Sequence, residues 1–152
     1  MSQIEQKIID LGFLLPETAK PLAAYIPAVQ SGNLVFTSGQ LPMISGNLAE
    51  TGKVGGSVSP ERAKELATVC ALNALAAVKT VIGDLDKIKR VVKVVGFVSS
   101  VPEFSGQPGV VNGASEFLGE VFGAKGIHAR SAVGVAVLPL DAPVELELIV
   151  EV

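Results

Sequence analysis

The sequence predicts an α+β domain in which a mostly antiparallel sheet carries two helices packed on one face. Three observations predict this class. After a short leading helix the elements follow the order ββαβαββ, one long helical segment has a clear apolar stripe, and the final strand alternates between apolar and polar residues. Because 152 residues is a usual length for one domain, we expect residues 1–152 to form a single domain.

The first predicted element is a short helix over residues 2–11. Ser2 and Glu5 have the spacing of a capping box, in which each side chain binds a free backbone N–H of the first turn. Apolar residues recur at helical spacing, so one face of this helix is suited to packing. We interpret residues 1–20 as an N-terminal extension that contains the helix.

Two short strands are predicted next, over residues 25–28 and 34–37. Residues 31–33, Ser-Gly-Asn, have the composition of a turn between them, so we expect a β-hairpin. Residues 38–40 end the second strand. Residues 42–58 are rich in Gly and Ser and show no periodicity, which indicates an irregular segment.

A long helix follows, with clear signals at both ends. Ser59 is a capping residue, Pro60 suits the first helical position, Glu61 adds an acid to the first turn, and Gly83 ends the helix. Its apolar stripe consists of Ala63, Leu66, Ala67, Cys70, Ala74, Ala77, Val78 and Val81. Since Cys70 belongs to this stripe, we expect it to be a buried core residue.

The remaining chain predicts a strand over 88–99, a helix over 110–122, a strand over 129–138, a turn over 139–143 and a strand over 144–152. In the final strand, apolar residues alternate with mostly acidic ones, which predicts one buried face. The apolar positions are Val144, Leu146, Leu148 and Val150.

The composition limits the possible partners. Hydrophobic residues make up 49% of the chain and charged residues only 18%, so a folded monomer leaves apolar area exposed, and we expect an oligomer. The net charge is −3, the pI is about 5.2, and Lys and Arg are scattered, which argues against nucleic acid as a partner. No apolar run reaches the ~18 residues of a membrane-spanning helix, so we expect no membrane partner.

The chain has one cysteine and one histidine. One cysteine allows no disulfide within the chain, which fits a cytoplasmic location. So few soft ligands also argue against a transition-metal site. The sequence has no P-loop, no Gly-x-Gly-x-x-Gly motif and no Gly-x-Ser-x-Gly elbow.

Arg130 is the first candidate functional residue. It stands near the start of the strand over 129–138, where its side chain points the same way as Ala132, Gly134 and Ala136. These small residues leave room for a planar group beside the guanidinium, whose donors bind a carboxylate through two parallel hydrogen bonds. An edge arginine that reaches water or pairs with a nearby Glu would give the same pattern, so both interpretations stay open here.

Glu145 is the second candidate. If residues 139–143 close a hairpin, Arg130 and Glu145 lie towards opposite ends of the paired strands and would meet most easily across a subunit boundary. The alternative is that Glu145, Glu147 and Glu151 form a solvated face without a role in chemistry.

The motifs around these candidates resemble those of a known family. Residues 36–42, Phe-Thr-Ser-Gly-Gln-Leu-Pro, are similar to the Thr-Ser-Gly-Gln-x-Pro signature of the RidA (YjgF) family. Residues 128–131, His-Ala-Arg-Ser, followed by Leu-Pro at 138–139 and Val-Glu-Leu-Glu at 144–147, are similar to its C-terminal signature. The resemblance extends over residues 21–152, in the same element order.

The resemblance implies a chorismate-mutase-like fold that assembles as a homotrimer with sites in the clefts between subunits. It also implies hydrolysis of reactive enamine/imine intermediates, such as 2-iminobutanoate and 2-iminopropanoate, to 2-oxoacids and ammonia. The substrate would be a small carboxylate. No metal or organic cofactor is implied, because an imine is already electrophilic and needs only a placed water and stabilised charge.

Individual roles are implied as well. Arg130 would hold the substrate carboxylate, and Glu145 would position the attacking water and take its proton. The other residues that the resemblance places at the site are Tyr25, Ser38, Gly39, Asn112 and Ala129.

The sequence departs from the family pattern at several positions. His128 stands where the family has Pro, Ala132 stands where Cys is often found, and residues 1–20 and 42–58 extend beyond compact members. His128 is two residues from Arg130, so it either tunes the anion pocket or only begins the strand.

Two other functions stay open. The same cleft could belong to a non-catalytic module that binds or senses a small carboxylate such as a 2-oxoacid, in which Arg130 matters and Glu145 does not. Members of the family have also been labelled endoribonucleases and translation inhibitors, but the acidic pI and the absence of basic clusters argue against RNA as the main partner.

Overall fold

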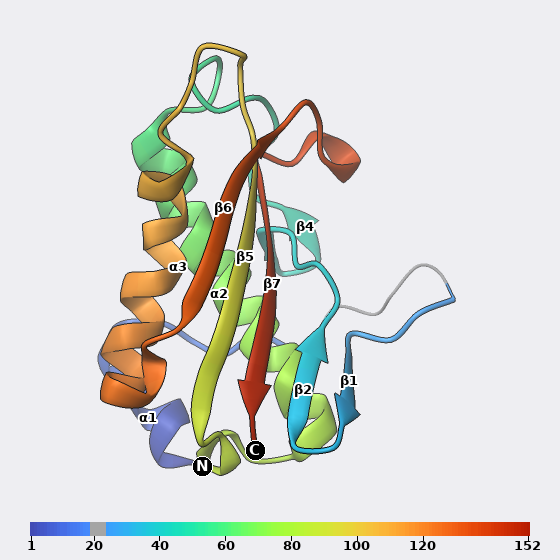
Figure 1. The fold of residues 1–152 in the computed structure, drawn as a ribbon, viewed down its shortest axis with the longest axis vertical. Helices are drawn as coiled ribbons and strands as arrows, with labels where there is room; N and C mark the ends of the chain where they lie inside the picture. The colour runs from blue at the N-terminus through green and yellow to red at the C-terminus, as the bar shows by residue number, and fades with distance from the viewer. Residues whose placement is uncertain (19–23) are drawn as a thin grey trace.

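The computed structural model describes residues 1–18 and 24–152 and shows a five-stranded sheet with two helices packed on one face (Figure 1). The helices are α1 (Gln3–Asp10), α2 (Pro60–Ile82) and α3 (Gln107–Phe122). The strands of the sheet are β1 (Ala28–Ser31), β2 (Leu34–Thr37), β5 (Arg90–Ser99), β6 (Ala129–Val135) and β7 (Val144–Glu151). Short 3-10 turns are η1 (Leu85–Lys87), η2 (Gly123–Gly126) and η3 (Pro139–Asp141), and β3 (Met43–Ile44) and β4 (Asn47–Leu48) form a separate ribbon.

The strands lie in the order β1-β2-β7-β5-β6. Neighbouring strands are antiparallel except β5 and β6, which are parallel and are connected through α3. The predicted mostly antiparallel sheet is therefore confirmed. The predicted hairpin between the last two strands is wrong, because β5 lies between β6 and β7 and pairs with both. A connection through a helix favours parallel neighbours, so β6 takes the free edge beside β5 and β7 pairs on the other side.

α2 has the predicted ends. The Arg62 N–H donates to Ser59 Oγ at 3.1 Å, and Gly83 follows the last turn with a φ of 77°. The helix is long and apolar enough to span a membrane, but 67% of its apolar window is buried inside the protein, as in a core helix. Cys70 is fully buried on it, and burial, followed by the Glu145 charge, raises the pKa of its thiol. The prediction of a core cysteine is confirmed.

α3 begins three residues earlier than predicted, at Gln107. Pro108 stands in its first turn, where the missing N–H is harmless because that turn has no acceptors for its N–H groups. The helix ends at Phe122, before Gly123, as predicted.

α1 is confirmed, but only half of its predicted capping box forms. The Glu5 N–H donates to Ser2 Oγ at 3.0 Å, whereas the Glu5 carboxylate pairs with Lys79 of α2 at 2.7 Å. The N–H groups of Gln3 and Ile4, which precede Glu5, donate to the carboxylate of Asp86 in η1 and lower the pKa of that carboxyl. The N-terminal extension is thus held by contacts with Lys79 and Asp86, which are far along the sequence. Residues 19 and 20, the last of the predicted extension, lie outside the described residues.

An N-terminal hairpin is confirmed, but its first strand, β1, runs over Ala28–Ser31 and shares only residue 28 with the predicted strand over 25–28. The turn is shorter than predicted, because Ser31 already pairs with Leu34. Pro27 stands in the predicted strand and has no N–H to donate to a ladder, which explains the later start. Within the segment predicted to be irregular, β3 and β4 pair across a turn at Ser45 and Gly46, both with positive φ. Two-residue strands are too short to produce a periodic pattern.

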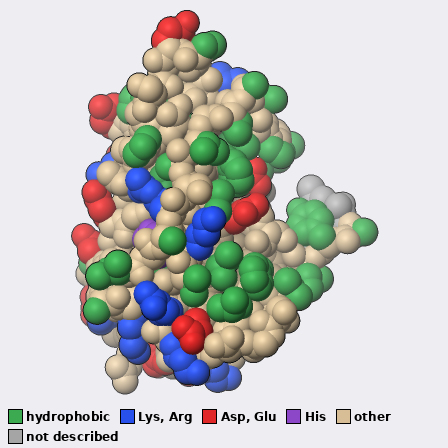
Figure 2. Space-filling model, viewed as in Figure 1, with side chains coloured by type: hydrophobic (Ala, Val, Ile, Leu, Met, Phe, Trp, Pro, Cys, Tyr) green, Lys and Arg blue, Asp and Glu red, His purple; other side chains and the backbone are tan. Residues whose placement is uncertain are grey.

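The two faces of the sheet differ in character. The face under α2 and α3 forms the core, and its fully buried strand residues include Val35, Val91, Val94, Val98, Leu146 and Leu148. No helix of residues 1–18 or 24–152 covers the other face, which exposes apolar side chains such as Val29, Phe36 and Val133. Figure 2 views this open face and shows hydrophobic side chains gathered over its strands, with charged groups between them.

Candidate functional site

Arg130 lies on the helix-covered face of the edge strand β6. It pairs with Val94 of β5, whose side chain is fully buried beneath the helices, and paired residues of neighbouring strands share a face. Ala132 and Gly134 point the same way, as predicted. A Cβ on Gly134 would lie 2.7 Å from Nε2 of Gln107, so α3 already occupies the space there. The small residue at 134 therefore lets α3 approach the edge strand, and does not leave the predicted room for a planar ligand.

Two neutral side chains of α3 hold the Arg130 guanidinium. Nη1 donates to Asn112 Oδ1 at 2.7 Å and to Ser115 Oγ at 3.3 Å. No carboxylate of the described residues forms an ion pair with Arg130. The Nε–H and Nη2 groups have no partner among the described residues either. The arginine is therefore fixed in direction while its charge remains uncompensated.

His128 lies next to Ser115. Its Nε2 is 2.9 Å from Ser115 Oγ, and its Nδ1 is 2.6 Å from the carbonyl oxygen of Gly126. The structure thus brings Asn112, Ser115, His128 and Arg130 together, and we call these four residues the arginine cluster. Ser115 was not predicted. The available signal was its position three residues after Asn112 on a helix, which places both on one face.

Glu145 lies on the opposite, open face of the sheet. It pairs with Phe97 of β5, whereas its neighbours Val144 and Leu146 are fully buried on the helix side. The side chain is half-buried. Burial, followed by the charge of Glu147, raises the pKa of the Glu145 carboxyl. Glu145 is consequently a stronger proton acceptor, once ionised, than an ordinary surface Glu.

Gly39 lies directly against the Glu145 carboxylate. A Cβ at this position would be 1.9 Å from Oε1 and 2.8 Å from Cδ of Glu145, so only glycine permits this approach. The Gly39 N–H and C=O are bonded to no other group in the part of the chain that the structure describes. A free backbone donor and acceptor therefore stand beside the carboxylate.

A β-bulge brings Gly39 to this place. Phe36 pairs with Ile149, but Gln40 pairs with Leu146, so β2 has one more residue than β7 between the two pairs. The Leu148 N–H, which lacks its usual backbone partner here, donates to Thr37 Oγ1 at 3.0 Å.

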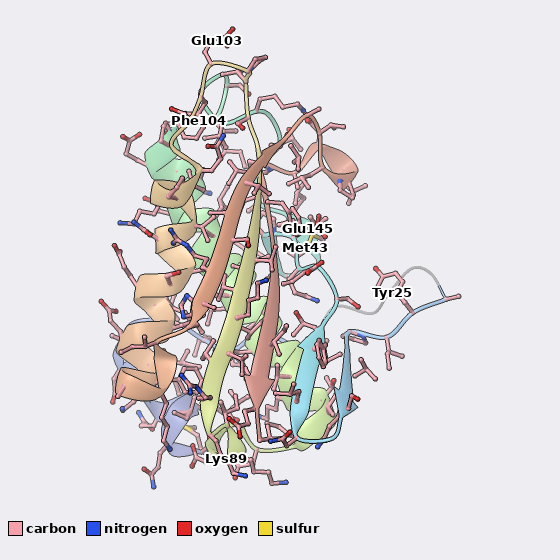
Figure 3. The ribbon with its side chains drawn as sticks, viewed as in Figure 1. Tyr25, Met43, Lys89, Glu103, Phe104 and Glu145 are labelled. Atoms are coloured by element: carbon pink, nitrogen blue, oxygen red, sulfur yellow. The ribbon has the colours of Figure 1, made fainter. Side chains whose placement is uncertain are left out.

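The other three predicted site residues form no side-chain hydrogen bond with Arg130 or Glu145 in the part of the chain that the structure describes. Ser38 supports the bulge, because its N–H donates to the Pro27 carbonyl at 2.8 Å and its hydroxyl to the Ile26 carbonyl at 2.6 Å. Tyr25 is 55% exposed, and Figure 3 shows it well apart from Glu145. Ala129 is exposed at the start of β6 and faces away from Arg130.

The two predicted catalytic residues do not meet within one chain. Arg130 and Glu145 lie on strands separated by β5 and on opposite faces of the sheet. Their separation was predicted, but from a hairpin that does not form. Among residues 1–18 and 24–152, no three or more His, Cys, Asp or Glu side chains group in a way that could hold a metal ion.

Comparison with known proteins shows which family the chain belongs to. The family profile described as "YjgF/chorismate mutase-like, putative endoribonuclease" matches residues 5–152. The chain belongs to the YjgF/RidA family. The chorismate-mutase-like fold that the motifs implied is confirmed with it.

Three relatives of this YjgF/RidA chain illustrate the range of names in the family. Protein TCP17 of Trypanosoma cruzi is 44% identical over 142 residues, which cover 93% of this chain and 89% of that protein. A 2-iminobutanoate/2-iminopropanoate deaminase of Dermatophagoides farinae is 35% identical over 136 residues, covering 89% and 91%. A crystal structure of a protein of unknown function from Agrobacterium tumefaciens is 51% identical, with a TM-score of 0.93 and coverage of 98% and 92%.

Proposed function

We propose that this YjgF/RidA protein hydrolyses small 2-imino acids, such as 2-iminobutanoate and 2-iminopropanoate, to 2-oxoacids and ammonia. In this reaction the oxygen of water bonds to the imine carbon while the C=N π electrons move to nitrogen. The resulting carbinolamine breaks its C–N bond, so that ammonia leaves and the former water oxygen becomes the carbonyl. One imino acid and one water give one 2-oxoacid and one ammonia.

The observation that carries the proposal is the uncompensated Arg130. Its Nη1 is held by Asn112 and Ser115, both neutral, and its remaining donors are free among the described residues. A carboxylate is the ligand that a guanidinium fork binds best through paired hydrogen bonds. Because two neutral acceptors on α3 orient Arg130 and no carboxylate of the described residues forms an ion pair with it, a ligand-binding role is favoured over a pair with a nearby Glu.

Glu145 supplies the second half of the proposed chemistry. A carboxylate with a raised pKa is suited to take the proton of the attacking water and return it to the leaving nitrogen. The free backbone groups of Gly39 lie beside it and are suited to orient water and the imine nitrogen. The half-buried setting strengthens these interactions, because less water screens them.

A complete site then requires two chains, because one chain directs Arg130 and Glu145 to opposite faces. We propose a homotrimer in which Arg130 of one subunit and Glu145 of the next line a shared cleft, with Tyr25 reaching in from a neighbour. The exposed apolar side chains of the open face, among them Phe36 and Val133, support an assembly that covers them.

The proposal is tested by generating 2-iminobutanoate in situ and following its decay with and without the purified protein. We expect faster decay with the wild type, no acceleration with Arg130→Ala, and full acceleration with Arg90→Ala, which removes an exposed arginine of β5. Light scattering should give about 47 kDa, three times the 15.6 kDa of one chain. A trimeric wild-type protein that leaves the decay rate unchanged would contradict the proposal.

A non-catalytic carboxylate-binding module is the second candidate, and the separation of Glu145 from the arginine cluster favours it. In that case Arg130 alone would determine the affinity for a 2-oxoacid, and Glu145→Gln would have no measurable effect. Titration of 2-oxobutanoate into Arg130→Ala and Glu145→Gln, together with turnover of each, separates the two functions.

A further inference from the structure

The direction of each hydrogen bond in the arginine cluster follows from which of its two groups can donate a proton. A carbonyl oxygen only accepts, so the contact of 2.6 Å to the Gly126 carbonyl requires a proton on Nδ1 of His128. In the neutral imidazole, Nε2 is then an acceptor. In that form the Ser115 hydroxyl, 2.9 Å away, donates to Nε2.

This direction determines whether Ser115 Oγ can accept a hydrogen bond from Arg130. The one hydroxyl proton of Ser115 is used by His128, so an oxygen lone pair is free to face the guanidinium. Arg130 Nη1 donates to that oxygen at 3.3 Å and to Asn112 Oδ1 at 2.7 Å. A continuous chain of donors then runs from Arg130 through Ser115 and His128 to the Gly126 carbonyl.

We propose that Ser115 and His128 are positioning residues that hold Arg130 in the orientation needed to bind a substrate carboxylate. His128 fixes the rotation of the Ser115 hydroxyl, and Ser115 with Asn112 occupies both hydrogens of Nη1. The edge formed by Nε and Nη2 is thereby presented to the ligand. This inference rests on the proposed role of Arg130.

Two substitutions of His128 separate positioning of Arg130 from support of the local fold. The amide of Gln extends about as far as Nε2, so His128→Gln keeps an acceptor for Ser115 and loses the bond to Gly126. The shorter amide of Asn lies near Nδ1, so His128→Asn keeps the bond to Gly126 and loses the bond to Ser115. A positioning role predicts activity in the Gln variant and loss in the Asn variant, whereas a role limited to the Gly126 bond predicts the reverse.

Turnover of 2-iminobutanoate gives the first measurement. Ser115→Ala and His128→Asn should each lower kcat/KM by about tenfold, mainly through KM, and His128→Gln should stay within about twofold of the wild type. The double variant Ser115→Ala/His128→Asn should be no worse than Ser115→Ala alone, because the two residues act through one hydroxyl. Additive losses, or an Asn variant more active than the Gln variant, would overturn the inference.

Nuclear magnetic resonance of the resting protein tests the positioning without any substrate. The chain has one histidine, so its imidazole nitrogens are assigned without ambiguity, and Nδ1 should carry the proton. The side-chain signals of Arg130, identified by their loss in Arg130→Lys, should average towards those of a free guanidinium in Ser115→Ala and His128→Asn but not in His128→Gln. Unchanged Arg130 signals in Ser115→Ala, or a proton on Nε2, would refute the positioning even if the deaminase activity is present. The expected signals in a protein without turnover would refute only the proposed function.

Discussion

The arginine cluster and the surroundings of Glu145 are two polar regions built in opposite ways. Arg130 has its direction set by side chains of its own chain, through two neutral acceptors on α3. Glu145 has Gly39 against its carboxylate and a raised pKa caused first by burial. One region presents a fixed and uncompensated positive charge, and the other a carboxylate that is costly to ionise. The sheet directs them to opposite faces. Under the proposed function each region would be half of a site, and the other half would come from a second chain.

The largest effect on turnover is expected for substitution of Glu145. Glu145→Gln removes the proposed proton acceptor at nearly constant volume, so kcat for 2-iminobutanoate should fall by about 10²- to 10⁴-fold. The affinity for 2-oxobutanoate, measured by titration calorimetry, should stay close to that of the wild type. A variant that retains kcat would assign the Glu145 region no chemical role in the turnover.

Substitution of Arg130 should weaken carboxylate binding and turnover together. Arg130→Ala removes charge-assisted hydrogen bonds to the carboxylate, which lowers kcat/KM by at least about tenfold for one bond and about a hundredfold or more for two. The dissociation constant for 2-oxobutanoate should rise in parallel. Arg90→Ala serves as the control, and equal losses in both variants would mean that general charge, not the oriented guanidinium, attracts the ligand.

Gly39→Ala tests the close packing in the Glu145 region. The new Cβ would displace the end of a flexible side chain, so the protein should fold while the carboxylate moves to another rotamer. We expect a decrease of about tenfold in kcat, because displacements of ~1 Å in an active site are costly. Gly119→Ala is the matched control, since a Cβ at that position of α3 meets nothing within 4 Å. Its kcat should be unchanged and its Tm slightly higher.

The smallest effect concerns stability and pH. The folded pKa of Glu145 lies above the ordinary value of 4.5, so the folded state binds this proton more tightly than the unfolded state does. Binding of this proton by Glu145 therefore stabilises the folded state below pH 4.5, and this contribution is lost as the pH rises through the folded pKa. Thermal unfolding at about pH 7 should therefore show Glu145→Gln to be at least as stable as the wild type, with the difference shrinking as the pH falls below the folded pKa. A variant that is less stable at neutral pH would show that ionised Glu145 is stabilised, not strained.

Elements with local signals were predictable from the sequence. The caps at Ser2 and Ser59, the stop at Gly83 and the alternation in β7 involve residues within a few positions of one another, and all of them form. The place of β6 beside β5 was not predictable in this way, because strand order depends on contacts between residues far apart in the sequence. The early start of α3 was missed because the predicted helix begins after Pro108, although proline is well suited to the first turn of a helix.

The candidate site was predictable in its residues but not in its arrangement. The motifs identified Arg130, Glu145, Gly39 and Asn112, and each of these occupies a polar region of the structure. The alternation in β7 places Glu145 away from the core, but only the parallel pairing of β6 with β5 puts Arg130 on the other face. Ser115 was missed because its spacing of three residues from Asn112 points to Arg130 only once the strand that faces α3 is known.

The most direct test of the central claim, that each site combines two chains, is complementation between inactive variants. Arg130→Ala and Glu145→Gln chains are refolded together in equal amounts and assayed with 2-iminobutanoate. Random mixing in a trimer gives three quarters mixed assemblies, each with one intact pair of Arg130 and Glu145, so about one quarter of the wild-type activity should return. If each chain forms its own site, the mixture will show only the average of the two residual activities, and a site shared between subunits will be refuted.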